Sequence, residues 1–196
     1  MAYDVADFLK KNNINSTGFT TTRINENKVF NDKKPVTELV SPPLKEIVYW
    51  FNQKSVNLYG EQLLRTLGMK FGKSASTTYG VKTIHDYWKA KGIAPETLNI
   101  VDGSGLSPAD RITTLSMAKV LYQAKKEKWF NTYLESLPTN NGLKMKSGSI
   151  ADVMGYAGYA AINGKEPVCF SIVINNYTGS SSAVRQKMFT LLNNLK

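Results

Sequence analysis

The chain has 196 residues, of which 42% are hydrophobic and 11% aromatic, and its 25 Lys and Arg outnumber its 15 Asp and Glu. This composition excludes disordered, collagen-like and disulfide-rich proteins, and it predicts one globular domain with or without a small subdomain. The net charge of +10 favours anionic partners. The basic residues are scattered, however, without an arginine-rich arm or an aromatic-basic RNA-binding pattern, so we expect no nucleic acid partner.

The first part of the chain, residues 3–36, predicts a leading helix followed by an extended segment. Residues 3–13 place three apolar side chains on one helical face, namely Val5, Phe8 and Leu9. Residues 19–23 predict extended chain, and the polar stretch 25–34 predicts a loop. No apolar run approaches the roughly 20 residues that a membrane-spanning helix needs.

Residues 37–137 predict a helical region. The first helix is expected to have Ser41 as N-cap and two prolines in its first turn, with an apolar face made by Leu44, Ile47, Val48 and Phe51. Further helices are expected at 58–68, at 77–91 with Gly92 as C-cap, at 113–126 and at 129–137. Residues 98–107 predict extended chain that leads into a glycine turn. The helical spacing of three tryptophans predicts core positions for Trp50, Trp88 and Trp129.

After Pro138 the hydrophobic period changes from helical to strand-like. Three strands are expected at 143–153, 155–162 and 167–175, with 163–165 as a hairpin connection, followed by a closing helix at 182–195. Helices, then an antiparallel meander, then a helix define an α+β fold. The single Cys169 lies in an apolar run and is predicted to be a small buried side chain. Cys169 and the single His85 are too few ligands for a zinc site, and we expect neither metal nor cofactor.

Three short polar strings stand out, although each has a plain structural explanation by itself. A Ser-x-Asn string caps helix ends, an Asp-Gly-Ser-Gly string makes a tight turn, and a Lys-Ser-Gly string suits an exposed edge strand. The strings are Ser55-Val56-Asn57, Asp102-Gly103-Ser104-Gly105 and Lys146-Ser147-Gly148-Ser149. Their order matches the serine acyl enzymes of the penicillin-binding class, in which a Ser-x-Asn loop precedes a Lys-Thr/Ser-Gly strand.

Longer stretches around the strings closely resemble the low-molecular-mass D-Ala-D-Ala carboxypeptidases and endopeptidases, which are class C penicillin-binding proteins of the serine β-lactamase/transpeptidase type. These stretches are SPPLKEIVYWFNQKSVNLYGEQLLRTLG (41–68), VDGSGLSPADRIT (101–113) and KMKSGSIADVMGYAGYA (144–160). The resemblance runs from about residue 3 to the end. It implies that residues 1–196 form the C-terminal part of a transpeptidase-like domain, with the glycine turn near its site.

The resemblance also implies a serine-type carboxypeptidase that cleaves peptidoglycan stem peptides ending in D-Ala-D-Ala through an acyl-enzyme and that β-lactams acylate. The expected catalytic residues are Ser55, Asn57 and Lys146, which would relay a proton to the leaving amine, hold the substrate amide and attract the terminal carboxylate. Substrate binding is expected at Ser147, Gly148 and Ser149, and the backbone N–H of Ser149 would form half of an oxyanion hole. Ser147 stands where the family usually has Thr, but it keeps the hydroxyl.

The nucleophilic Ser-x-x-Lys of the family is expected upstream of residue 1, together with a secretion signal. The fragment alone is therefore expected to be inactive, and the complete protein is expected in the periplasm or cell envelope. Ser116-Met117-Ala118-Lys119 matches the pattern, but it follows the Ser-x-Asn string in a helix that the family uses structurally, with Thr114 as cap and Leu115 entering the core. We interpret it as a chance match. His85 has no serine elbow nearby and is predicted to be structural.

Two other functions remain open on the sequence. One is a non-catalytic module that binds peptidoglycan peptides without cleaving them, and the other is a basic nucleic-acid binder, which would show salt-dependent affinity. The resemblance further implies that the first strands of the sheet are missing. It predicts an uncovered sheet edge that a second molecule fills or that promotes aggregation.

Overall fold

A computed structural model describes residues 2–16, 38–161 and 166–196. The chain forms two compact units, with the boundary after Ser41. The first contains helix α1 (Ala2–Lys11), close to the predicted leading helix, although Val5 and Phe8 are exposed. The predicted extended segment 19–23, the loop 25–34 and the hairpin connection 163–165 lie outside the described residues.

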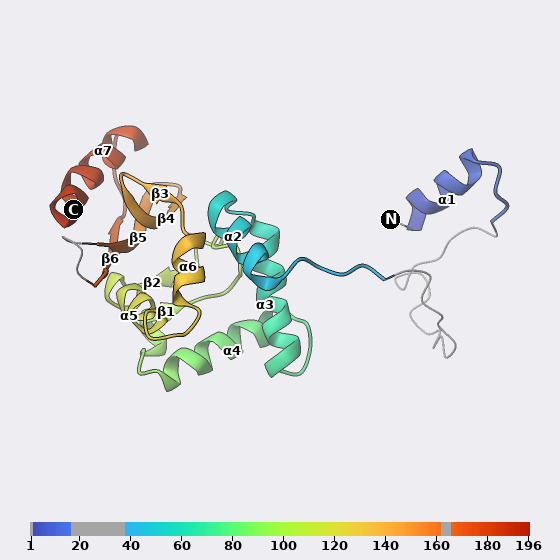
Figure 1. Cartoon of the computed structure of the whole chain (residues 1–196), viewed down its shortest axis with the longest axis horizontal. Helices are drawn as coiled ribbons and strands as arrows, with labels where there is room; N and C mark the ends of the chain where they lie inside the picture. The colour runs from blue at the N-terminus through green and yellow to red at the C-terminus, as the bar shows by residue number, and fades with distance from the viewer. Residues whose placement is uncertain (1, 17–37, 162–165) are drawn as a thin grey trace. The chain divides into compact units, whose positions relative to one another are not determined.

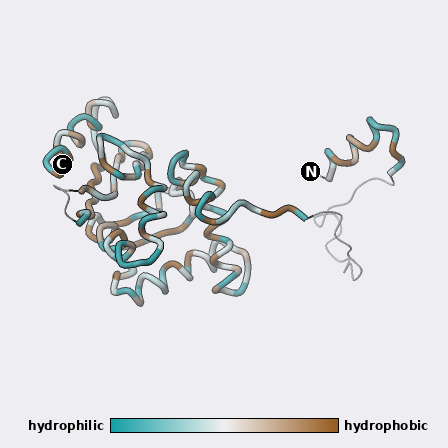
Figure 2. Tube along the Cα trace, viewed as in Figure 1, coloured by the Kyte–Doolittle hydropathy of each residue, from teal (hydrophilic) through white to brown (hydrophobic). Residues whose placement is uncertain are grey.

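The second unit holds six α-helices in its described residues (Figure 1). They are α2 (Leu44–Lys54), α3 (Asn57–Phe71), α4 (Thr77–Ala90), α5 (Thr114–Ala124), α6 (Phe130–Ser136) and α7 (Ser181–Leu192), with short 3-10 turns η1 (Pro95–Thr97) and η2 (Asn193–Leu195). Hydrophilic and hydrophobic residues alternate at short intervals along this unit in Figure 2, as expected for amphipathic helices.

Two predicted helix boundaries are wrong for identifiable reasons. The N-cap of α2 is Pro43 rather than Ser41. Ser41 and Pro42 each precede a proline, and a residue before proline is disfavoured in the helical conformation. Helix α3 continues past Gly68 to Phe71. A Cβ added to Gly68 would meet the backbone N of Gly80 at 2.8 Å, so this glycine allows α3 and α4 to approach closely and does not end the helix.

An antiparallel sheet in the order β3-β4-β5-β6 forms the second half of this unit. Its strands are β3 (Thr139–Asn140), β4 (Leu143–Ile150), β5 (Val153–Ala160) and β6 (Val168–Ile174). The three predicted strands correspond to β4, β5 and β6, and β3 is an additional short strand. Asn141 and Gly142 join β3 to β4 with positive φ angles of 48° and 74°, as expected for a two-residue hairpin turn. A separate two-stranded ribbon pairs β1 (Leu98–Asn99) with β2 (Arg111–Ile112).

The two faces of the sheet carry separate hydrophobic clusters. Between the sheet and α7, Met145 and Met188 are fully buried, and the apolar side chains of α7 at Val184 and Leu192 join them. On the other face, Leu121 of α5, Leu137 and Tyr159 form the second cluster, with Cys169 partly buried against it. Side chains alternate along a strand, so Lys144 and Lys146 of β4 lie on this second face, opposite to Met145.

Some side chains predicted to lie in the core are exposed. Trp50 is 49% exposed and Trp129 52% exposed, whereas Trp88 is half-buried. The apolar face of α2 exists as predicted, but it contains no fully buried residue. Helix α2 packs mainly against α6 and α3, and Leu44 and Trp50 are exposed.

Candidate active site

Ser55 lies at a sharp junction between two helices. Helix α2 ends at Lys54, and Ser55 caps it in the left-handed conformation, with φ 52° and ψ 49°. Val56 is extended and precedes α3, whose first residue is Asn57. Because a single left-handed residue reverses the chain, the two helices meet without a longer loop, and the exposed side chains of Ser55 and Asn57 stand two positions apart at the junction.

The ammonium of Lys146 reaches this junction from the sheet. Its Nζ donates a hydrogen bond to Oγ of Ser55 at 2.5 Å and a second one to the carbonyl oxygen of Ser147 at 3.1 Å. Burial lowers the pKa of Lys146, since desolvation disfavours the charged form of an amine. The structure therefore brings two of the predicted catalytic side chains into direct contact across 91 residues of sequence.

The strand that follows Lys146 has an open side. Strand β3 pairs with β4 only at Leu143 and Lys144, so within the described residues 145–150 have a strand neighbour on the β5 side alone. Ser147, Gly148 and Ser149 are all exposed there, and a Cβ added to Gly148 would meet nothing within 4 Å. The hydroxyls of Ser147 and Ser149 make no hydrogen bond to any other described residue. This edge offers backbone and hydroxyl groups to an extended ligand.

The Asp-Gly-Ser-Gly string forms a turn organised by one carboxylate. Oδ1 of Asp102 accepts hydrogen bonds from the backbone N–H groups of Ser104 (2.9 Å) and Gly105 (2.5 Å), and Oδ2 accepts one from Ser107 (2.9 Å). Partial burial opposes ionisation of Asp102, but the hydrogen bonds from Gly105 and Ser107 outweigh it, so the pKa of this carboxyl lies below its usual value. The turn is therefore held by an ionised side chain.

Glu61 and Gly60 attach this turn to the first part of α3. Oε1 of Glu61 accepts hydrogen bonds from the backbone N–H groups of Gly103 and Ser104, both at 3.0 Å. Gly60 is buried against the backbone of Gly103. The turn thus supports the end of α3 that carries Asn57, one helical turn before Glu61. Sequence reasoning missed Glu61, because a glutamate on a helix beside a glycine turn gives no signal in the sequence.

The second carboxyl of this region, Asp110, faces the same turn. Its Oδ1 accepts a hydrogen bond from the backbone N–H of Val101 at 2.7 Å, and its Oδ2 is buried without a hydrogen-bond partner among the described residues. Burial, and then the negative charge of Asp102, raise the pKa of Asp110. The two carboxyls therefore ionise at different pH values, Asp102 first.

The Ser-x-x-Lys string at 116–119 contains a buried, hydrogen-bonded hydroxyl. Ser116 is 4% exposed, its Oγ donates to Oγ1 of Thr97 at 2.7 Å, and its backbone N–H donates to Oγ1 of Thr113 at 3.1 Å. The cap of α5 is thus Thr113 rather than Thr114, and Leu115 is exposed rather than in the core. Lys119 is exposed and makes no hydrogen bond to Ser116.

His85 has a structural contact. Its Nε2 accepts a hydrogen bond from the backbone N–H of Ile100 at 3.2 Å, which ties α4 to the residue that follows β1. This arrangement agrees with the structural role predicted for His85.

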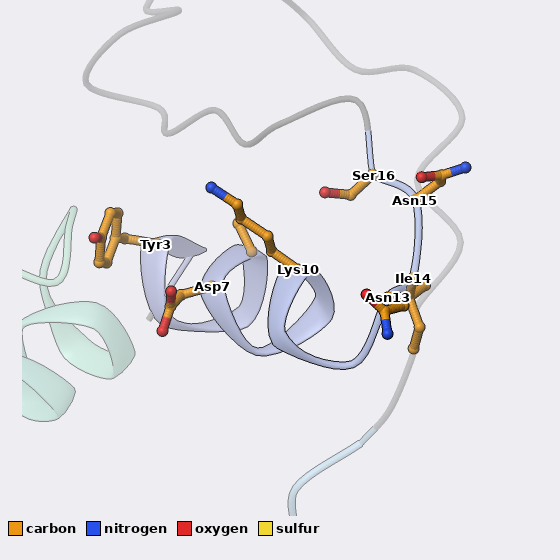
Figure 3. A pocket seen from close by; sticks show the side chains of 8 residues that line it. Tyr3, Asp7, Lys10, Asn13, Ile14, Asn15 and Ser16 are labelled. Atoms are coloured by element: carbon orange, nitrogen blue, oxygen red, sulfur yellow. The ribbon is translucent and has the colours of Figure 1, made fainter.

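A hollow in the first unit is unrelated to these residues. It measures about 610 Å³ and is lined by α1 side chains, including Tyr3, Asp7 and Lys10, and by residues 13–16 of the turn that follows (Figure 3). Asp7 is engaged in an ion pair with Lys11 at 2.7 Å. None of the predicted site residues lines this hollow. Within the part of the chain that the structure describes, no helix is both long and apolar enough to cross a membrane.

Comparison with known proteins decides the family. The model of the D-Ala-D-Ala carboxypeptidase 3 (S13) family matches residues 2–195. The chain belongs to this S13 family. A D-alanyl-D-alanine carboxypeptidase from Actinomadura sp. (strain R39) is 25% identical over 170 residues, which are 76% of this chain and 31% of that protein.

Solved structures similar to this S13 chain confirm the predicted α+β fold. Penicillin-binding protein 4 from Haemophilus influenzae matches with a TM-score of 0.69 and 21% identity, over 78% of this chain and 40% of that one. A structure of the same protein complexed with a β-lactam matches with a TM-score of 0.76 and 24% identity, over 97% of this chain and 49% of that one. The chain thus spans half or less of the length of these relatives.

Proposed function

We propose that this chain supplies one wall of the active site of a serine-type D-Ala-D-Ala carboxypeptidase that acts on peptidoglycan stem peptides. The observation that carries the proposal is the hydrogen bond between Lys146 and Ser55 beside the open edge of β4. A peptide that ends in D-Ala-D-Ala has an extended backbone and a terminal carboxylate. The exposed edge at 147–149 suits the backbone, and the ammonium of Lys146 suits the carboxylate.

In the proposed reaction, a serine hydroxyl attacks the carbonyl carbon of the penultimate D-Ala and forms an acyl-enzyme, and water then hydrolyses the ester. When the peptide C–N bond breaks, Ser55 passes a proton to the departing D-Ala amine. The lowered pKa of Lys146 favours exchange of a proton with the Ser55 hydroxyl, to which it is hydrogen-bonded. Asn57 holds the substrate amide.

The remaining proposed roles belong to the edge of β4. The hydroxyls of Ser147 and Ser149 donate to the terminal carboxylate, and the open space above Gly148 leaves room for the peptide. The backbone N–H of Ser149 stabilises the oxyanion. This last role rests on the family resemblance, because the described residues include only one side of the site.

We propose that the attacking serine comes from outside these 196 residues. The burial and hydrogen bonds of Ser116 support this, since the one Ser-x-x-Lys of the sequence has no accessible hydroxyl. The exposed apolar side chains of α2 and α3, such as Leu44, Trp50 and Leu58, support a further chain segment that covers these helices. The complete enzyme would act in the cell envelope and would be acylated by β-lactams.

The function is tested by titrating the ¹⁵N-labelled chain with a peptide that ends in D-Ala-D-Ala and following amide chemical shifts. We expect shifts concentrated at residues 146–149 and at the 55–57 junction. The same peptide with L-Ala-L-Ala serves as the stereochemical control. Equal shifts for both peptides, or shifts that avoid β4, would contradict the proposal.

A matched pair of variants separates the roles within this titration. Lys146→Met removes the cation that attracts the carboxylate, and it should weaken binding at least severalfold. Lys119→Met removes an exposed lysine of α5 and should leave binding unchanged. A non-catalytic peptide-binding module would give the same shifts, and it differs only in that no β-lactam would acylate the complete protein.

We also propose that the free edge of β6 mediates association. Among the described residues β6 pairs only with β5, and its seven residues contain neither a charge nor a proline. Exposed edges of this kind accept another strand. A second copy of this chain, pairing antiparallel with its own β6, satisfies the same backbone groups on both molecules.

A further inference from the structure

The C-terminal end of α6 is hydrogen-bonded both to α2, which leads to Ser55, and to β4, which carries Lys146. Helix α6 is only seven residues long and ends at Ser136. The last carbonyl groups of any helix lack partners within that helix. Here the carbonyls of Glu135, Ser136 and Leu137 all accept hydrogen bonds from side chains of other elements. We call these three carbonyls and the Ser136 hydroxyl the α6 terminus cluster.

Helix α2 is fixed to this cluster by its last turn. Nδ2 of Asn52 donates to Oγ of Ser136 at 2.7 Å, and Nε2 of Gln53 donates to the carbonyl oxygen of Ser136 at 2.9 Å. Oγ of Ser136 in turn donates to the carbonyl oxygen of Tyr133 at 2.6 Å. Ser55 follows Gln53 by two residues, so the cluster holds the turn that ends at the Ser-x-Asn junction.

Strand β4 is fixed to the same cluster from the other side. Nζ of Lys144 donates to the carbonyl oxygen of Leu137 at 3.0 Å and to that of Glu135 at 3.4 Å. The backbone N–H of Met145 donates to the carbonyl oxygen of Pro138 at 3.0 Å. Lys146 is the next residue along β4. Ser55 and Lys146 therefore each follow, by two residues, a side chain that is hydrogen-bonded to the end of α6, namely Gln53 and Lys144.

Ser136 bonds α2 through both its hydroxyl and its carbonyl, and it lies between the two residues whose carbonyls accept from Lys144. It is 2% exposed, and with Ser116 it is one of two buried polar residues among those described. A buried hydroxyl without partners costs about 1 to 3 kcal/mol, so such a residue in a helix end calls for the partners that it has here. The side chains that donate to Ser136 come from α2. The next residue, Leu137, accepts a hydrogen bond from Lys144 at its carbonyl oxygen.

We propose that Ser136 is a positioning residue that sets the spacing between Ser55 and Lys146 by joining α2 to the end of α6. It touches neither residue. On one side it bonds Asn52 and Gln53, and on the other the carbonyls of the adjoining residues, Glu135 and Leu137, accept from Lys144. The inference rests on the proposed function for its relevance to catalysis. The coupling itself concerns only the structure of this chain, so it is measured without substrate.

The test follows the Lys146 side chain by NMR of its ammonium and adjacent carbon across a pH titration. Lys146→Met assigns the signal against the neighbouring Lys54 and Lys144. In the native chain, we expect a pKa below the usual lysine value because Lys146 is partly buried against Ser55. In Ser136→Ala we expect this pKa to move up toward the usual value, because the loosened junction lets water reach the amine.

Ser116→Ala is the matched control. It removes the other buried serine hydroxyl, which bonds Thr97 in a different part of the unit, and it should leave the Lys146 titration unchanged. Ser136→Thr keeps a hydroxyl and should restore the native value. Where Ser136→Ala fails to fold, Asn52→Ala decides, since Asn52 is only half-buried and its removal deletes the same hydrogen bond to the Ser136 hydroxyl.

Two results would overturn the inference. One is a Lys146 pKa that stays native in both Ser136→Ala and Asn52→Ala. The other is an equal shift in Ser116→Ala, which would indicate general loosening of the protein rather than a connection through α6. Neither result bears on whether the chain binds D-Ala-D-Ala peptides, and a failed peptide titration would leave the Lys146 titrations intact.

Discussion

Gly60 and Gly103 lie so close that a Cβ on Gly60 would be 2.1 Å from the carbonyl oxygen of Gly103, and one on Gly103 would be 2.3 Å from the carbonyl oxygen of Gly60. Each glycine therefore allows the other to approach. This contact, between backbone atoms alone, seats the Asp102 turn against α3 and so supports Asn57 at the start of that helix.

Gly60→Ala is expected to destabilise the protein by about 1 to 3 kcal/mol, because the added methyl group meets backbone that has no room to shift. In a free helix the same change stabilises by about 1 kcal/mol, so the sign itself is informative. Urea unfolding measures the effect. Gly148→Ala, whose Cβ meets nothing within 4 Å, should leave stability nearly unchanged, and equal losses in both variants would refute the steric argument.

Asp102→Ala should cost about 1 to 3 kcal/mol at neutral pH, since it removes a charged acceptor of several hydrogen bonds. Because the pKa of folded Asp102 lies below the usual 3.8, its stabilisation is present above that pH and is lost as the pH falls through the lowered value. The stability difference between native protein and variant should therefore shrink in strong acid. Asp86→Ala, which breaks only an exposed pair with Lys82, should change stability by less than about 0.5 kcal/mol.

Lys146→Met predicts a pH dependence of the same sign, in the alkaline range. The folded pKa of Lys146 lies below its usual 10.5, so the unfolded chain binds more protons between these two values. The native protein should consequently gain stability relative to Lys146→Met as the pH rises through that window. Paired urea unfolding curves from neutral pH to pH 10.5 measure this difference, and a flat difference would show that burial does not affect this amine.

Incubation of the chain with a labelled penicillin should give no covalent adduct by intact-protein mass spectrometry. Ser116 is 4% exposed and engaged with Thr97 and Thr113, while Ser55 has Lys146 as a partner but no Ser-x-x-Lys motif of its own. An adduct mapped to Ser116 would overturn the assignment of that hydroxyl as structural and would place the nucleophile within this sequence.

Val168→Lys should reduce self-association measured by light scattering at high protein concentration. Val168 is 44% exposed at the start of the β6 edge, and a lysine on an edge strand opposes pairing with another strand. Leu191→Lys replaces an apolar residue that is 58% exposed on α7, away from any strand. This control should associate like the native protein, and a native chain that stays monomeric at all concentrations would exclude the β6 pairing.

The sequence predicts elements well where local pattern and packing agree. Helix α4 begins and ends within one residue of the prediction, because Ser76 caps it with its side chain and Gly92 follows it with a φ of 81°. Strand β3 was missed because two residues are too few to show a period, although the Asn141-Gly142 turn after it is a hairpin signal. Trp50 and Trp129 were misplaced because helical spacing says which side chains share a face and not whether another element covers it.

The site divides in the same way. Ser55 and Lys146 were singled out from motifs, and the contact between them, across 91 residues of sequence, comes from the structure. Glu61 and Ser136 could not be found, because their partners are 42 and 84 residues away and single polar residues on helices have no distinguishing pattern. The catalytic and binding roles proposed for Ser55, Asn57, Lys146 and residues 147–149 all stay predictions, since a contact between two side chains does not show what either does in a reaction.

The left-handed backbone of Ser55 has an energetic consequence. A residue with a Cβ pays roughly 1 to 2 kcal/mol for this conformation, whereas glycine adopts it freely. Ser55→Gly would thus relieve strain at the helix junction while deleting the oxygen that Lys146 contacts. Thermal stability and the proposed proton relay therefore make opposite demands on position 55, and a variant selected only for heat resistance would tend to lose the hydroxyl there.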